Sequence, residues 1–117
     1  MDTWQEKITN DMQKGRKAQE EGKHGLARVC ARRAAGWAIQ ENLARNGIDL
    51  NTRSAFEYIQ YQASQSGNPP RMQQSLEYMM RKMEKDSLEE DAYWPLPEVD
   101  LLLEAEWLIK ELLDFNI

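Results

Sequence analysis

The chain has 117 residues, of which 41% are hydrophobic and 30% are charged, with six glycines and four prolines. This length and composition are those of a globular domain, and they exclude a disordered or fibrous chain. The net charge of −5 disfavours a protein that is drawn as a whole onto nucleic acid, because phosphate contacts need clustered lysines and arginines. We therefore expect one domain, residues 1–117, with its own hydrophobic core.

The charge is divided unevenly along the chain. Residues 1–53 hold 10 Lys/Arg against 7 Asp/Glu, a net charge of +3, whereas residues 54–117 hold 5 against 13, a net charge of −8. Attraction between the two halves is the simpler interpretation. The alternative is that the basic half presents a local face to an anionic ligand.

The sequence favours a cytoplasmic location. Cys30 is the only cysteine, so the chain has no internal disulfide and a reducing compartment fits it best. The first residues lack the basic start and the apolar run of a signal peptide. No stretch approaches the roughly 18 apolar residues that suggest a membrane span. We expect no membrane association.

Two long helices are predicted at the start of the chain. Trp4, Ile8 and Met12 share one face of a helix that is expected from Thr3 to about Glu21. Two glycines in the segment 22–25 then reverse the chain. In the second helix, from about Gly25 to Asn46, a narrow stripe of small residues allows another helix to approach closely, so this helix is expected to be central. The stripe consists of Ala27, Ala31, Ala34 and Ala38, with Leu26, Cys30, Trp37 and Ala44 beside it.

Three further helices complete the predicted fold. The third is expected to be capped by Asn51 or Thr52, and the fourth to begin at Pro69-Pro70. The fourth helix has an apolar stripe of Met72, Leu76, Met79, Met80 and Met83. After a loop over residues 89–97, the last helix is expected from about Pro97 to Asp114. The predicted fold class is all-α, an up-and-down bundle of four to five helices.

The sequence offers no catalytic residue, no metal site and no cofactor site. His24, the only histidine, lies three residues after Glu21, but the neighbouring glycines place it in a turn, and a di-metal bundle needs more inward carboxylates. Cys30 has alanines on its helix and no base nearby. Glycine-rich phosphate loops are absent. These observations favour a protein that is not an enzyme.

Two groups of residues are candidates for binding. Arg28, Arg32 and Arg33 could grip a phosphate or an RNA backbone. The simpler interpretation pairs these arginines with the acidic residues of the last helix. Those acids are Glu98, Asp100, Glu104, Glu106 and Glu111. Tyr93 and Trp94, in the predicted loop, either cover the end of the bundle or form a partner interface.

The order of these segments resembles the HEPN superfamily of small helical bundles. The resemblance lies in a long first helix, the turn Gly22-Lys23-His24-Gly25 and an Ala/Arg-rich second helix over residues 27–36. It implies a HEPN-like bundle that forms a homodimer, and a small bacterial nucleotidyltransferase as partner. The RNase members of the family carry an Arg, four to six residues and then a His, late in the chain. Here Arg16 precedes His24 with seven residues between them and no later histidine exists, so no catalytic residue is carried over.

Three hypotheses follow from the sequence. The first is a non-catalytic, dimeric binding or assembly module for another protein, such as a nucleotidyltransferase, with a nucleotide in a groove near Arg28 and Arg32. The second is an enzyme that acts on RNA or nucleotides, a toxin-like RNase with an atypical site. The third is a structural subunit of a larger complex, which docks through Trp94.

Overall fold

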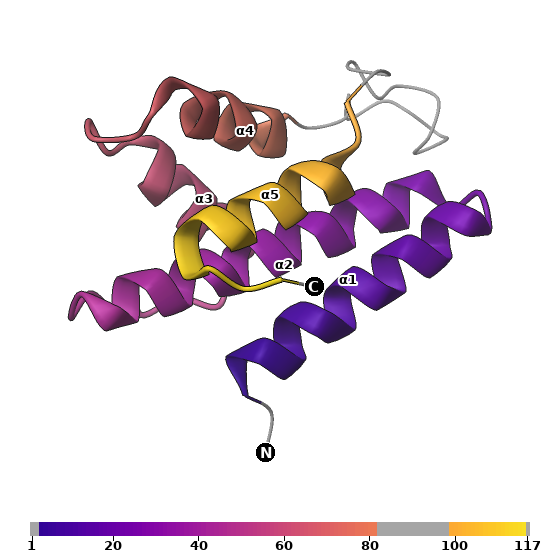
Figure 1. The fold of residues 1–117 in the computed structure, drawn as a ribbon, viewed down its shortest axis with the longest axis horizontal. Coiled ribbons are helices and arrows are strands. Elements are labelled where there is room, and N and C mark those ends of the chain that lie inside the picture. Colours follow the sequence, from indigo (N-terminus) through magenta and orange to yellow (C-terminus); the bar gives the residue numbers. More distant parts are fainter. Residues whose placement is uncertain (1–2, 82–98, 117) are drawn as a thin grey trace.

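The computed structural model describes residues 3–81 and 99–116. Within these ranges the chain forms five helices and no strand, which confirms the predicted all-α class (Figure 1). The helices are α1 (Trp4–Glu20), α2 (His24–Arg45), α3 (Ala55–Ala63), α4 (Pro70–Met80) and α5 (Leu101–Leu113). Tyr93 and Trp94, the loop predicted over residues 89–97, Met83 and Glu98 lie outside the described residues.

The first two helices form the predicted hairpin. The side chain of Thr3 accepts a hydrogen bond from the Glu6 amide at 3.1 Å and thereby caps α1. Gly22 follows α1 with a φ of 78°, a backbone conformation that favours glycine, and the chain reverses there. His24 is the first residue of α2 and is exposed, so it belongs to the helix rather than to the turn.

Helix α2 is the central element, as predicted. It packs against α1, α3 and α5, and its small residues are almost fully buried. The buried set includes the predicted stripe of Ala27, Ala31, Ala34 and Ala38, together with Ala35. Leu26 and Ala44, which the sequence placed beside the stripe, are exposed because they lie on the side of α2 away from this packing.

Two glycines allow the closest helix contacts. A Cβ on Gly36 of α2 would lie 2.6 Å from the Cβ and 2.8 Å from the Cα of Ala55, so the start of α3 rests directly on α2. A Cβ on Gly15 of α1 would lie 2.6 Å from the end of the Leu102 side chain in α5. These contacts determine how near α3 and α5 come to the first two helices.

Two helix starts differ from the prediction. Ser54 caps α3, because its hydroxyl accepts from the Glu57 amide at 3.2 Å. Thr52 instead accepts from the Ser54 amide, and Asn51 has a φ of 53°, so neither begins the helix. Helix α5 starts at Leu101 rather than at Pro97, since the Asp100 carboxylate accepts from the amide of Leu102 at 2.9 Å.

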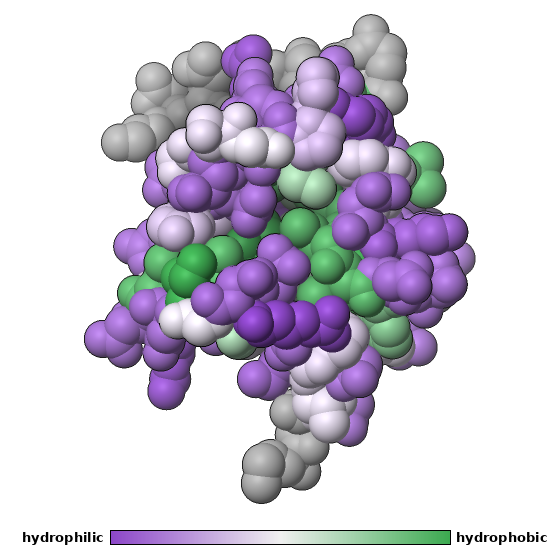
Figure 2. Space-filling model, turned by 60° about the vertical axis from the view of Figure 1, so that its left-hand side comes forward, coloured by the Kyte–Doolittle hydropathy of each residue, from purple (hydrophilic) through white to green (hydrophobic). Residues whose placement is uncertain are grey.

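Helix α5 runs antiparallel to α1 and therefore in the same direction as α2 (Figure 1). Three contacts between α1 and the α5 region establish this: Gln19 with Asp100 at 3.2 Å, Arg16 with Glu106 at 3.1 Å, and the rings of Trp4 and Phe115 at 5.2 Å. Figure 2 shows apolar side chains in a band across one face, between hydrophilic side chains above and below. No described helix has both the length and the apolarity needed to cross a bilayer.

Candidate functional site

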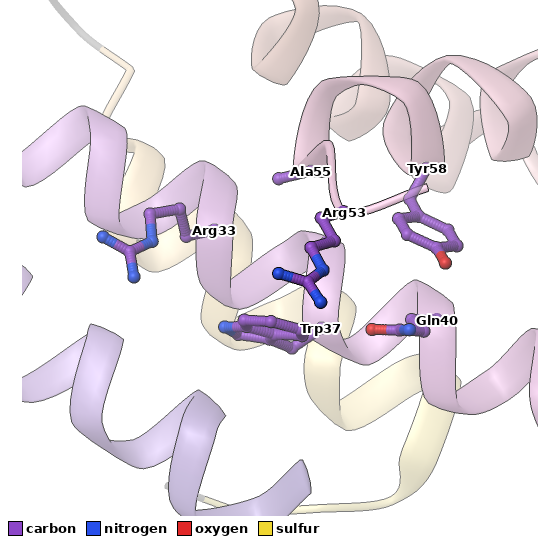
Figure 3. A pocket seen from close by; sticks show the side chains of 7 residues that line it. Arg33, Trp37, Gln40, Arg53, Ala55 and Tyr58 are labelled. Atoms are coloured by element: carbon purple, nitrogen blue, oxygen red, sulfur yellow. The ribbon is translucent and has the colours of Figure 1, made fainter. Parts of the chain in front are cut away.

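A pocket of about 180 Å³ lies between the middle of α2 and the beginning of α3 (Figure 3). Its chemistry is basic and aromatic, with few aliphatic groups. Four lining residues come from α2, namely Arg33, Gly36, Trp37 and Gln40, and three come from the segment that enters α3, namely Arg53, Ala55 and Tyr58. The pocket thus combines two guanidinium groups, an indole, an amide and a phenol.

Helical spacing and one glycine build this pocket. Arg33, Trp37 and Gln40 are separated by four and three residues, so they share one face of α2. Gly36 lies beside them and lets Ala55 touch the α2 backbone. Because Arg53 is two residues before Ala55, this close approach brings its side chain to the same face.

A buried carboxylate positions two of the lining side chains. Asp11 of α1 is only 3% exposed. The indole Nε1 of Trp37 donates to its Oδ2 at 2.8 Å, and Nε of Arg33 lies 3.6 Å from its Oδ1. A buried carboxylate needs such partners, and in turn it restrains the indole and the guanidinium. Asp11 is thus a positioning residue for the pocket.

The Trp37 ring separates this pocket from a second hollow. The second hollow has a volume of about 280 Å³ and is lined by Trp4, Lys7, Trp37, Gln40, Glu41 and Ala44. The Nζ of Lys7 lies 4.6 Å from the centre of the Trp37 ring, a distance at which a cation is attracted to an aromatic face. Trp37 and Gln40 therefore contribute to both hollows, which lie next to each other along α2.

Arg53 and Tyr58 form the α3 side of the pocket. Arg53 is exposed, makes no hydrogen bond or ion pair with any other described residue, and points its guanidinium toward Trp37 (Figure 3). The hydroxyl of Tyr58 donates to the carbonyl of Thr52 at 3.1 Å. Burial, and then the Asp49 carboxylate, raise the pKa of Tyr58, so its hydroxyl stays protonated and able to donate at neutral pH.

The three arginines singled out in the sequence do not form one site. Arg33 lines the pocket, whereas Arg32 turns to the end of α4, where its Nε donates to the carbonyl of Met79 at 2.8 Å and its Nη2 donates to that of Arg81. Burial, and then the nearby charge of Arg28, lower the pKa of Arg32. The second arginine of the pocket is Arg53, which lies 20 residues further along the chain and was not singled out in the sequence. The guanidinium groups of Arg33 and Arg53 point in different directions (Figure 3).

For Arg33, the described ion pairs differ from the predicted pairing with the last helix. Glu104 pairs with Arg71 at 2.8 Å and Glu106 with Arg16 at 3.1 Å. The carboxylate beside Arg33 is Asp11 of α1, because Arg33 faces α1 and α3 rather than α5.

The role of Arg32 at the end of α4 leads to an expected result. Its donors satisfy carbonyls that the helix end leaves without partners. Replacing Arg32 with methionine should therefore accelerate hydrogen exchange in the last turn of α4 by about tenfold, the equivalent of one lost hydrogen bond. Mass spectrometry of exchanged peptides measures this. Arg45→Gln, which removes an exposed arginine at the far end of α2, should leave α4 unchanged, and an unaltered exchange rate in Arg32→Met would contradict the assignment.

His24 lies apart from the pocket, and Cys30 lies inside the core. His24 is nine residues before Arg33 on α2, about 14 Å along the helix axis. Cys30 is buried, and burial, followed by the charge of Asp11, raises the pKa of its thiol. Among the described residues, no group of three or more His, Cys, Asp or Glu side chains is placed to hold a metal ion.

Comparison with protein-family models, with curated proteins and with solved structures gives no match for this chain. The class of the protein is therefore defined by its own fold and site. It is an all-α bundle with an open, basic and aromatic pocket between two of its helices. The HEPN-like identity stays a prediction from the order of its segments.

Proposed function

We propose that the chain is a non-catalytic binding module that holds an anionic group of a partner, a carboxylate or a phosphate, in the pocket between α2 and α3. The observation that carries this proposal is the exposed Arg53 guanidinium, which points toward the half-buried Trp37 in a pocket that Arg33 also lines (Figure 3). The homodimer and the nucleotidyltransferase partner implied by the HEPN resemblance belong to the same proposal.

The chemistry of the lining residues supports an anionic ligand. A guanidinium presents N–H donors in a planar fork that matches the oxygens of a carboxylate or a phosphate. Arg53 has no described partner, so a ligand need not break an existing ion pair to reach it. Arg33 is already restrained by Asp11, which reduces the entropy that it loses on binding. The Trp37 ring offers apolar area beside both groups.

The size of the pocket favours a single group over a whole nucleotide. Its volume of about 180 Å³ is smaller than the roughly 300–1,000 Å³ of sites that enclose drug-sized ligands. A side chain or a terminal carboxylate of another molecule fits this volume. This supports a group of another protein, rather than a whole nucleotide, as the ligand of the pocket between α2 and α3.

The environment of the pocket supports binding rather than turnover. None of its lining residues is a carboxylate or a histidine that could serve as a general base. The carboxylate that contacts two of these residues, Asp11, already accepts from Trp37 and faces Arg33.

Arg53→Gln is the variant that tests this function. Affinity for a fluorescein-labelled pentaglutamate peptide, measured by fluorescence anisotropy, should fall by about tenfold, because a hydrogen bond to a charged group contributes about 1.5 kcal/mol or more. Thermal stability should stay unchanged, since Arg53 is exposed and makes no polar contact with the described residues.

Lys110→Gln provides the matched control. It removes the same charge from an exposed position on α5, away from the pocket, and should leave the affinity nearly unaltered. Equal losses in the two variants would show that the peptide senses only the net charge, and the proposed site would be wrong.

A further inference from the structure

We infer that one exposed face of α2 is the docking surface for an acidic, amphipathic helix of another protein. This face, called here the α2 face, consists of Leu26, Val29, Arg33, Trp37 and Gln40. The inference rests on the proposed function, because the anionic group that enters the pocket belongs to the docked helix.

The residues of the α2 face form a continuous stripe. They are separated by three, four, four and three residues, so they follow one side of the helix over about 21 Å. Leu26 is 47% exposed and Val29 is 45% exposed, although both are large and apolar. The polar pocket and two exposed aliphatic side chains are thus aligned along a single helix. A partner helix recognises such a stripe with its own i, i+3, i+4 and i+7 positions.

The two hollows give this face the shape of a groove. One lies on the α3 side of Trp37 and the other on the α1 side, and both extend along α2. Each hollow alone, about 180 and about 280 Å³, is smaller than a typical pocket for a whole small ligand. A helix laid over Trp37 would place one side chain into each hollow, whereas a compact small molecule would occupy only one of them.

The charges around the groove determine the chemistry of the partner. Lys7 lines the hollow on the α1 side, Lys14 lies two turns further along the same side of α1, and Arg33 and Arg53 line the pocket on the α3 side. The nearby carboxylates are engaged: Asp11 is buried beside Arg33, Glu41 pairs with Arg45 at 3.0 Å, and Asp49 accepts from the Asn51 amide at 2.8 Å. The groove is therefore positive, and an acidic helix complements it.

A second copy of this chain does not supply the acidic surface that this groove requires. In a twofold dimer whose axis passes through the α2 face, this face of one copy contacts the α2 face of the other. Such a contact would bring Arg33 and Arg53 of the two copies toward one another without a free carboxylate between them. The homodimer implied by the HEPN resemblance would then need a twofold axis that does not pass through the α2 face.

Two synthetic peptides test the inference. The first has 18 residues, with leucines spaced i, i+3, i+7 and i+10 and glutamates on the flanking positions; the second is a scrambled version of the same composition. Fluorescence anisotropy should show saturable binding of the first peptide and binding at least about tenfold weaker for the second, because only the first presents a stripe that matches the α2 face.

Surface variants locate the binding. The double variant Leu26→Ser/Val29→Ser should lower the affinity for the striped peptide by about tenfold, and Arg53→Gln should lower it by a similar factor. Leu103→Ser is the matched control, because Leu103 is 62% exposed on α5 and lies outside the groove. The single variants Leu26→Gln and Val29→Gln, checked by circular dichroism, provide the same test if the double variant unfolds.

The outcomes separate this inference from the proposed function. If Arg53→Gln weakens binding while the Leu26 and Val29 variants do not, the docking surface is wrong and the anion pocket stands. If neither the Leu26 and Val29 variants nor Arg53→Gln changes binding, both fail. The inference is also overturned if the two peptides bind equally, or if a single-stranded oligouridine of 12 residues binds at these positions and the striped peptide does not.

Discussion

Gly36→Val is expected to lower the free energy of unfolding by about 3 kcal/mol and to distort the pocket. Any Cβ at this position would lie 2.6 Å from the Ala55 Cβ and 2.8 Å from its Cα, and the latter is backbone that cannot turn aside. Overpacking of this kind costs about 1–3 kcal/mol for added methyl groups, and valine adds three carbons. Chemical denaturation followed by circular dichroism measures the loss. Gly36→Ala should show a smaller loss, because better helix propensity offsets part of the overlap.

Two variants separate the close contact from a general effect of replacing glycine. Gly67→Ala should leave stability within about 0.5 kcal/mol of the parent, because nothing lies near the added methyl group. Adding Ala55→Gly to Gly36→Ala should recover part of the lost stability, since it removes the nearer of the two contacts. A Gly36→Val protein as stable as the parent would mean that α3 does not rest on α2 at this point.

Asp11→Ala is expected to cost about 2 kcal/mol of unfolding free energy. The substitution removes a buried acceptor and leaves the N–H of the half-buried Trp37 indole without its partner, and an unsatisfied buried donor costs about 1–3 kcal/mol. The loss of the ion pair with Arg33 adds little, because that guanidinium is half exposed. Asp11→Asn should recover most of the stability, since its amide oxygen can still accept from the indole.

The indole resonance of Trp37 reports whether Asp11 positions the ring. In Asp11→Ala the indole proton should exchange faster with solvent and its NMR resonance should move, whereas in Asp11→Asn both changes should be smaller. Control variants at Asp49, an exposed acid near α3, should leave this resonance in place. If Asp11→Ala leaves both the stability and the indole resonance unaltered, the hydrogen bond at 2.8 Å contributes nothing to the pocket.

Most of the fold could be predicted from the sequence because its signals are local. The apolar spacing of α1, the glycines around residue 22 and the alanine stripe of α2 each act within a few turns of helix. These signals predicted the bounds of the first two helices to within one or two residues, and they predicted the central position of α2. The starts of α3 and α5 were missed because several polar residues before each helix could have capped it. Only the backbone geometry shows that Ser54 and Asp100 do so.

The pocket depends on contacts between distant parts of the chain, which helical periodicity does not report. Arg33 was singled out with Arg28 and Arg32 because they are neighbours in sequence, yet the other arginine that lines its pocket is Arg53. The sequence did contain one signal for Asp11. This residue shares a face of α1 with Ile8, Met12 and Gly15, and that face is buried. A carboxylate in such a position calls for a buried partner.

The most direct test of the anion-binding pocket is a titration of ¹⁵N-labelled protein with the pentaglutamate peptide, followed on the tryptophan indole resonances. The chain has four tryptophans, and a Trp37→Phe variant identifies the resonance of Trp37. We expect that resonance to shift in a saturable manner, the indole of Trp107 on α5 to stay in place, and the shift to disappear in Arg53→Gln. A Trp37 resonance that does not move, or one that moves as far in Arg53→Gln as in the parent, would contradict a binding site at this pocket.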